Sequence, residues 1–201
     1  MLLFFADKTN PLLREVIPDV SDFKDLSLHE AIDNMRYSIL PEQLKAAGAS
    51  YQGAAGMAAN QWGIKQRVFI FTPDGSAEGN RQEVMINPRY RYYLREGETV
   101  PVMKTGYEGC FSVPLTAGLV NRYEAILAQY ETPEGKRIEK VMEGWEARVF
   151  QHETDHLDGK LFDGALDGYQ GPECLERVVF KDLEDRDRFW QDVVKRQRED
   201  V

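Results

Sequence analysis

The chain has 201 residues, a hydrophobic fraction of 42% and a formal net charge of -9. This length suits one folded domain over residues 1–201, and the negative charge argues against nucleic-acid binding, which needs clustered Lys and Arg. The N-terminal apolar run stops at Asp7 and no stretch reaches transmembrane length, so we expect no signal peptide, no membrane segment and a cytoplasmic protein. With two cysteines, Cys110 and Cys174, a disulfide framework of the secreted kind is excluded.

The first half of the chain combines a helix with a loop rich in small residues. Ser27 and Glu30 form a capping-box pattern before apolar residues at helical spacing, which predicts a helix from Leu28 to about Leu40. Small residues dominate from Gly48 to Gly63. This composition predicts a loop whose backbone comes close to another group.

Strands are expected in the middle of the chain. The runs RVFIF, EVMINP and YRYYL begin at Arg67, Glu83 and Tyr90 and are separated by turn-forming residues, so they predict three strands. The segment 125–145 alternates in two runs joined at 133–135, which predicts a hairpin. We therefore expect a mostly antiparallel sheet here.

The segment QHETDH, residues 151–156, holds two of the three histidines. Trp145, Val149, His152 and His156 share one face of a helix predicted from Trp145 to Asp158, which Gly159 would end. At about 100° per residue, the two imidazoles lie about 40° apart around the helix axis. They can therefore point into one cavity.

The pattern H-E-x-x-H predicts a catalytic metal site. Two imidazoles one helical turn apart form a clamp for a transition metal, and Glu153 beside them can take a proton from metal-bound water. Such a site needs a third protein ligand. A metzincin-type histidine is excluded because Phe162 occupies its position, which leaves Cys110 and Glu176 as alternatives.

A C-terminal helix is predicted over about residues 176–198. Val179, Leu183, Trp190 and Val194 fall at helical spacing there, which is typical of an amphipathic helix packed on a sheet. Its charges nearly balance, so we interpret them as a solvated face.

Three motifs together resemble the peptide deformylase family: AAGMAANQ (54–61), EGCFS (108–112) and QHETDH (151–156), in the family's order and approximate spacing. Weaker matches at NPLLRE and INP extend the resemblance over roughly residues 10–162. With the predicted elements, it implies an α+β fold in which antiparallel or mixed sheets surround a central HExxH helix, with N-terminal and C-terminal helices. It implies a hydrolase that removes the N-formyl group from the N-terminal methionine of nascent polypeptides.

The resemblance also implies the metal ligands and the chemistry. The ligands would be Cys110, His152 and His156, around one divalent ion per chain, Fe(II) in the cell, which Zn, Ni or Co can replace. A metal-bound water would attack the formyl carbon, with Glu153 as general acid and base. The side-chain amide of Gln61 and the backbone N–H of Phe111 would stabilise the oxyanion.

The expected substrate contacts follow from the same resemblance. A peptide that adds as an extra strand needs close backbone approach, for which we select Ala55, Gly56 and Gly109. Trp145 and Val149 are candidate walls of a methionine pocket. Formyl-methionyl peptides are the expected partners. Housekeeping members of the family often end in a basic helix that suits the ribosome surface, whereas the tail of this chain is charge-balanced. A ribosome contact therefore stays open.

Several points depart from the family or have alternatives. Ala54 stands where the family's first motif begins with glycine, and Ala117 stands where members commonly carry an arginine that contacts the peptide. Glu108 and Arg14 are candidates for a supporting pair behind the metal. For Asp155, a role in this support and a role as a structural hydrogen-bond acceptor both stay open. The alternative functions are a zinc endopeptidase that uses Glu176 and a metal-binding protein of this family without turnover.

Overall fold

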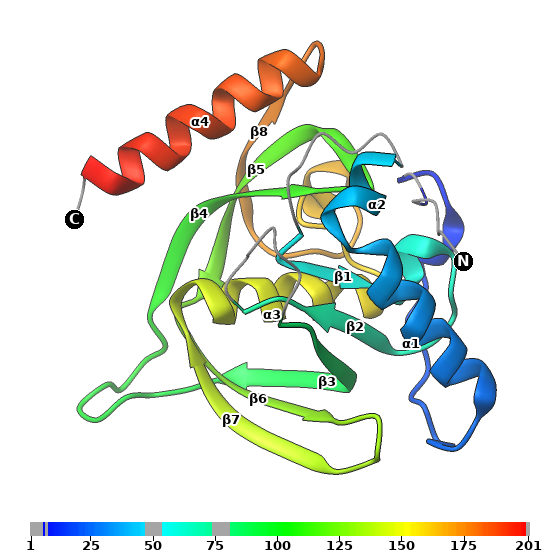
Figure 1. Cartoon of the computed structure of the whole chain (residues 1–201). Helices are drawn as coiled ribbons and strands as arrows, with labels where there is room; N and C mark the ends of the chain where they lie inside the picture. Colours follow the sequence, from blue (N-terminus) through cyan, green and yellow to red (C-terminus); the bar gives the residue numbers. More distant parts are fainter. Residues whose placement is uncertain (1–5, 7, 47–53, 74–80, 200–201) are drawn as a thin grey trace.

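The computed structural model describes residue 6 and residues 8–46, 54–73 and 81–199. Figure 1 shows two sheets with one helix running between them. The helices are η1 (Pro11–Arg14), α1 (Leu26–Ser38), α2 (Pro41–Ala46), η2 (Ala59–Trp62), α3 (Gly144–Leu157), η3 (Gly164–Asp167) and α4 (Leu183–Glu199), where η marks a 3-10 helix. None of these described helices combines the length and the apolar character that a bilayer crossing requires.

The strands pair antiparallel throughout both described sheets. Sheet A has the order β1-β2-β3-β6-β7 and sheet B the order β4-β5-β8. Sheet A comprises β1 (Gly56–Ala58), β2 (Val68–Phe71), β3 (Glu83–Tyr92), β6 (Ala125–Glu131) and β7 (Arg137–Glu143), and sheet B comprises β4 (Met103–Cys110), β5 (Val113–Tyr123) and β8 (Cys174–Val179). The predicted α+β class is confirmed, as is the hairpin formed by β6 and β7.

Helix α3 lies between the sheets and contacts strands of both (Figure 1). Its apolar side chains pack against sheet A in a cluster that includes Ala147, Val149, Phe150 and Leu157. The prediction of this helix is confirmed, and Gly159 follows its end with φ +71°, a conformation that favours glycine. Polar side chains of α3 are also buried, namely Gln151, Glu153, Thr154, Asp155 and His156. Because burial of polar groups costs free energy unless they are paired, this helix requires a polar environment built by other elements.

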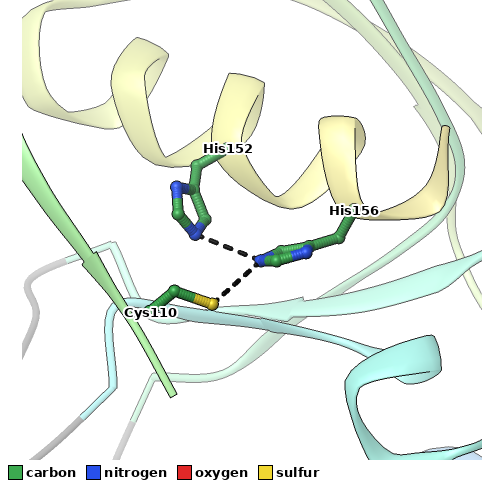
Figure 2. A group of neighbouring side chains, drawn as sticks. All are labelled: Cys110, His152 and His156. Carbon is green, nitrogen blue, oxygen red and sulfur yellow. Dashed lines mark hydrogen bonds between the residues drawn. The ribbon is translucent and has the colours of Figure 1, made fainter. Parts of the chain in front are cut away.

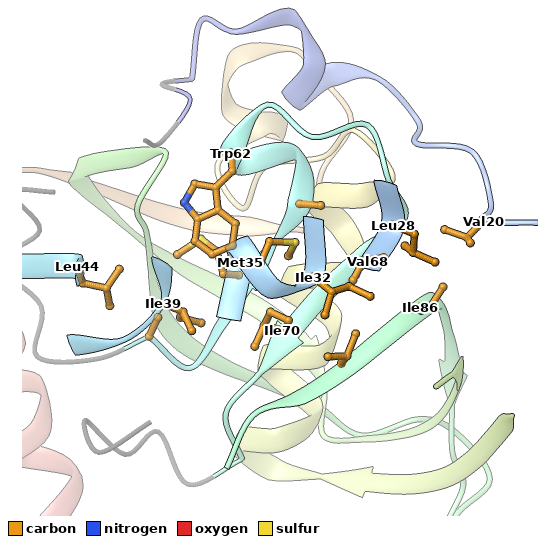
Figure 3. Close-up of a cluster of buried hydrophobic side chains, with 14 residues drawn as sticks. Val20, Leu28, Ile32, Met35, Ile39, Leu44, Trp62, Val68, Ile70 and Ile86 are labelled. Atoms are coloured by element: carbon orange, nitrogen blue, oxygen red, sulfur yellow. The ribbon is translucent and has the colours of Figure 1, made fainter. Parts of the chain in front are cut away.

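The other face of sheet A is covered by α1 (Figure 3). Leu28, Ile32 and Met35 on α1 pack against Val68 and Ile70 of β2. The predicted capping box at Ser27 is wrong in register. Helix α1 begins earlier, with Asp25 as the N-cap, whose side chain accepts a hydrogen bond from the Ser27 N–H at 2.8 Å. A carboxylate is at least as good an N-cap as a serine hydroxyl.

Two further predictions differ from the structure. The runs that begin at Glu83 and Tyr90 form one strand, β3. The pairing of β3 with β6 shifts in register between Ile86 and Arg89. Pro88, which has no backbone N–H, lies in this shift and therefore interrupts no hydrogen bond of the ladder. The C-terminal helix begins at Leu183 rather than at residue 176. The preceding residues form β8, since pairing with β5 outweighs their helical spacing.

The predicted small-residue loop is only partly described. Residues 48–53 lie outside the described part of the chain. The rest forms strand β1 and the 3-10 helix η2, which ends at Gly63 with φ +76°. β1 and η2 contain most of the first family-like motif, residues 54–61, and place it next to the metal centre.

Candidate metal centre

Three donor atoms meet between α3 and the end of β4 (Figure 2). The Nε2 atoms of His152 and His156 are 3.2 Å apart, and Sγ of Cys110 lies 3.3 Å from Nε2 of His156. Ligands of one tetrahedral ion, with bonds of about 2.1 Å to nitrogen and about 2.3 Å to sulfur, are separated by about 3.4 to 3.6 Å. The donor set therefore fits a single divalent ion that accepts thiolate and imidazole ligands.

The geometry of two elements brings these donors together. His152 and His156 project from consecutive turns of α3, as their spacing predicts. Cys110 is the last residue of β4, where the register to β5 shifts after Gly109. Since side chains alternate along a strand, Cys110 and Glu108 face α3 together.

Glu108 orients His152 for metal binding. Its Oε2 lies 2.9 Å from Nδ1 of His152, so Nε2 of that ring is left to face the donor cluster. Phe162 stacks on the same ring, with centroids 6.1 Å apart. A phenyl ring thus supports the histidine at the sequence position where a metzincin would carry a third one.

The two imidazoles differ in charge before a metal binds. Burial lowers the pKa of His156, and the neighbouring His152 lowers it further, so this ring is neutral. Burial would also lower the pKa of His152, but hydrogen bonds to Cys110 and Glu108 raise it well above the usual value. Metal binding therefore displaces a proton from His152.

A buried charge network surrounds Glu108. Arg122 of β5 donates to both carboxylate oxygens, at 3.0 and 2.9 Å, and also donates to Asp155 of α3. Arg148 of α3 donates to Oε1 of Glu108 at 2.7 Å. Burial alone would raise the pKa of Glu108, but Arg122 and His152 outweigh it and hold the pKa well below the usual range. Glu108 is therefore ionised.

The predicted partner of Glu108 is wrong. Arg14 of η1 instead stacks over the ring of Tyr169, at 4.1 Å from its centroid. Sequence reasoning missed Arg122 and Arg148 because they reach Glu108 through the β4–β5 pairing and the packing of α3. Asp155 accepts hydrogen bonds from Arg122 and from Tyr90, as the structural reading of this residue requires.

Replacement of Arg122 by methionine should lower the free energy of unfolding by about 3 to 5 kcal/mol, because it leaves the buried carboxylate of Asp155 without a cation and that of Glu108 with Arg148 alone. Chemical denaturation of the metal-free protein measures this change. The matched control is Arg137→Met. Its ion pair with Glu131 involves an arginine side chain that is 90% exposed, so little change is expected. A loss below about 1 kcal/mol for Arg122→Met would contradict the structural role.

Glu153 lies next to the donor cluster and is 4% exposed. Its Oε2 has no hydrogen-bond partner in the described part of the chain. Gly56 of β1 packs directly on this side chain, because a Cβ at Gly56 would lie 2.6 Å from Cγ of Glu153. Burial raises the pKa of Glu153 to about 7. A carboxyl group with a pKa near neutrality can both accept and donate a proton.

Gln61 of η2 also reaches the donor cluster. The N–H of Ala58 donates to its Oε1 at 2.9 Å, which orients the amide so that Nε2 donates to Sγ of Cys110 at 3.2 Å. Asn60, next along η2, donates to the backbone oxygen of His156 at 2.6 Å. Helix η2 is therefore hydrogen-bonded to both elements that supply the metal ligands, β4 and α3.

The chain is similar to one known family over most of its length. The family model described as "Polypeptide deformylase" matches residues 5–169. The chain belongs to the polypeptide deformylase family. Peptide deformylase 1 of Corynebacterium glutamicum is 35% identical over 158 residues, which cover 79% of this chain and 83% of that protein. Peptide deformylase 2 of Pseudomonas syringae is 34% identical over 66% of this chain and 73% of that protein.

Solved deformylases share the fold. The Thermotoga maritima enzyme matches with a TM-score of 0.63 and 29% identity, over 86% of this chain and 99% of that one. The Acinetobacter baumannii enzyme, in a structure bound to Met-Ala-Ser, matches with a TM-score of 0.62 and 31% identity, over 81% of this chain and 96% of that one. Like its relatives, the chain is a metal-dependent hydrolase that removes the formyl group of N-terminal formylmethionine.

Family membership and the donor cluster exclude the zinc endopeptidase. The zinc endopeptidase required Glu176 as a metal ligand, but Glu176 is exposed on β8 and accepts a hydrogen bond from the hydroxyl of Tyr107 at 3.2 Å. It lies outside the donor cluster formed by Cys110, His152 and His156. The form without turnover is not supported either, since Glu153 and Gln61 both lie at the site.

The remaining candidate residues occupy several environments. Gly56 and Gly109 lie on β1 and β4, which are edge strands of sheets A and B among the described strands. Ala55, directly before β1, is partly buried. Val149 is packed in the cluster between α3 and sheet A, while Trp145 at the start of α3 is 47% exposed.

Proposed function

We propose that this deformylase hydrolyses formyl-methionyl peptides at one divalent ion held by Cys110, His152 and His156. The meeting of these three donors with the buried carboxylate of Glu153 carries the proposal. When bound, the ion would act as a Lewis acid toward water and the formyl oxygen. We propose Fe(II) as the cellular ion, with Zn, Ni or Co as replacements, because these ions accept imidazole and thiolate ligands.

Glu153 is proposed as the group that moves the proton. It accepts a proton from the attacking water and delivers it to the leaving amine. Its raised pKa of about 7 supports both steps near neutral pH.

Gln61 and Phe111 are proposed to stabilise the negative charge that develops on the formyl oxygen. The Gln61 amide is held by Ala58 with its N–H group toward Cys110, so this donor is oriented before substrate binds. The backbone N–H of Phe111, directly after Cys110, is proposed as the second donor. Two fixed donors beside a cation would lower the barrier without reorganisation.

We propose that the peptide adds as a strand along the edges near Gly56 and Gly109. Main-chain hydrogen bonding of this kind is largely independent of sequence, which suits an enzyme that acts on many chain ends. Ala55 is proposed to contribute backbone contacts beside Gly56. Trp145 and Val149 are proposed walls of the methionine pocket, because they lie on the helix face of His152.

The cellular setting is also a proposal. Nascent chains are the proposed substrates and the cytoplasm is the proposed location. Both cysteines, Cys110 and Cys174, are free thiols, which agrees with a reducing compartment.

The direct test is hydrolysis of formyl-Met-Ala-Ser, followed as formate release, by protein loaded anaerobically with Fe(II) or with Ni. We expect rapid turnover with either ion. Acetyl-Met-Ala-Ser serves as the control and should not be cleaved, because it lacks the formyl carbon. A fully metallated protein that releases no formate would overturn the proposal.

A further inference from the structure

Helix α4 packs on the outer face of sheet B, opposite α3, and reaches the strand that bears Cys110. Trp190 lies against Gly109: a Cβ built there would be 2.9 Å from Cζ2 of the indole. Phe189 packs edge to face on Tyr107, with ring centroids 4.9 Å apart. Tyr107 and Gly109 thus face α4, while Glu108 and Cys110 face α3.

The strand pairing leaves space for the indole at this point. Gly109 pairs with Ala117 of β5, and Ala117 is fully buried. Two small residues opposite each other allow a large ring to rest directly on the β4 backbone. The indole of Trp190 and the side chain of the metal ligand Cys110 therefore lie on opposite faces of β4, at neighbouring positions of the strand.

We infer that Trp190 is a specificity-determining residue for the second residue of the substrate, the one that follows formylmethionine. The inference rests on the proposed function, because it concerns a peptide bound along the free edge of β4. Successive side chains of an extended peptide point to opposite faces. If the methionine side chain points to the α3 side, the next side chain points to the α4 side, toward Trp190.

The state of the indole supports a contact with substrate. Trp190 is only partly buried, so part of the indole that lies against Gly109 is accessible. Its Nε1 is nevertheless shielded from solvent and has no hydrogen-bond acceptor within residues 8–46, 54–73 and 81–199, although a buried indole N–H normally has a partner. An aromatic surface of this kind favours apolar and aromatic side chains.

The test compares formyl-Met-Phe-Ser, formyl-Met-Ala-Ser and formyl-Met-Asp-Ser as substrates of the metal-loaded enzyme. We expect kcat/KM to be roughly tenfold higher for the Phe peptide than for the Ala peptide, chiefly through KM, and lowest for the Asp peptide. Trp190→Ala should bring the Phe to Ala ratio close to one. Trp190→Phe should retain most of the ratio, because it keeps an aromatic surface.

Leu183→Ala is the matched control, since Leu183 is an apolar residue of α4 that is 42% exposed and is expected to leave the ratio unchanged. An equal loss for all three peptides in Trp190→Ala, or an unchanged ratio, would overturn the inference. These outcomes are distinct from failure of the proposed function, in which the unsubstituted enzyme would release no formate from any peptide. Thermal unfolding of each variant shows whether it is folded. If Trp190→Ala does not fold, the Phe to Ala ratio of the unsubstituted enzyme decides, and a ratio close to one overturns the inference.

Discussion

Replacement of Cys110 by alanine should abolish metal retention and, with it, deformylase activity. The Cys110 thiolate is one of three donors in the cluster, and two imidazoles alone hold a divalent ion far less tightly. Loss of an outer partner of a metal ligand already weakens affinity by about 10- to 100-fold, so loss of the ligand itself should exceed this. Metal content after gel filtration and formate release measure the effect.

Cys174→Ala is the matched control for this variant. Both cysteines are free, buried and members of the same apolar cluster, so the two replacements remove the same atom from similar surroundings. Cys174 donates instead to the backbone oxygen of Glu176, at 3.2 Å. We expect Cys174→Ala to keep its metal and its activity. If Cys110→Ala also kept both, the assignment of the ligands would be wrong.

Glu153→Gln should lower kcat by about 10² to 10⁴-fold while the metal stays bound. The amide keeps the size of the side chain, so the packing against Gly56 is preserved, but it can no longer accept a proton from water. In the unsubstituted enzyme, activity should fall on the acidic side as Glu153 becomes protonated. Burial places the pKa of Glu153 at about 7 without metal, and a bound cation lowers it, so this acidic limb should lie below pH 7.

The pH profile and a second glutamate provide the controls. The residual activity of Glu153→Gln should lack the acidic limb, because the titrating carboxyl group is gone. Glu176→Gln, a change in the exposed glutamate on β8, should retain full activity and the full pH profile. Undiminished turnover in Glu153→Gln would require another proton acceptor and would refute its assigned role.

The HExxH helix could be predicted from sequence because its geometry is local. The spacing of His152 and His156 determines that their side chains share one face, whatever surrounds the helix. Gly159 marks its end for the same reason, since φ near +71° suits glycine. The hairpin of β6 and β7 was also predictable, because alternation and turn residues lie within one short segment.

The C-terminal segment shows where local patterns fail. Residues from Glu176 to Val179 fit helical spacing but form β8, because β5 offers them a partner strand. Helical spacing over so few residues is weak compared with a row of backbone hydrogen bonds. The indole of Trp190 packs against Gly109. This contact could not be predicted from the spacing of residues along the chain.

For the metal centre, the residues by themselves determined a two-histidine clamp with an adjacent carboxylate, and left Cys110 and Glu176 as alternatives for the third ligand. The match to three family motifs favoured Cys110, and the tertiary structure places its sulfur 3.3 Å from His156. Only the pairing of β4 with β5 and their packing on α3 decided that Arg122 and Arg148 surround Glu108. The physical reason is that helix periodicity acts over one turn, whereas a buried carboxylate takes its cations from whichever elements the core packs around it.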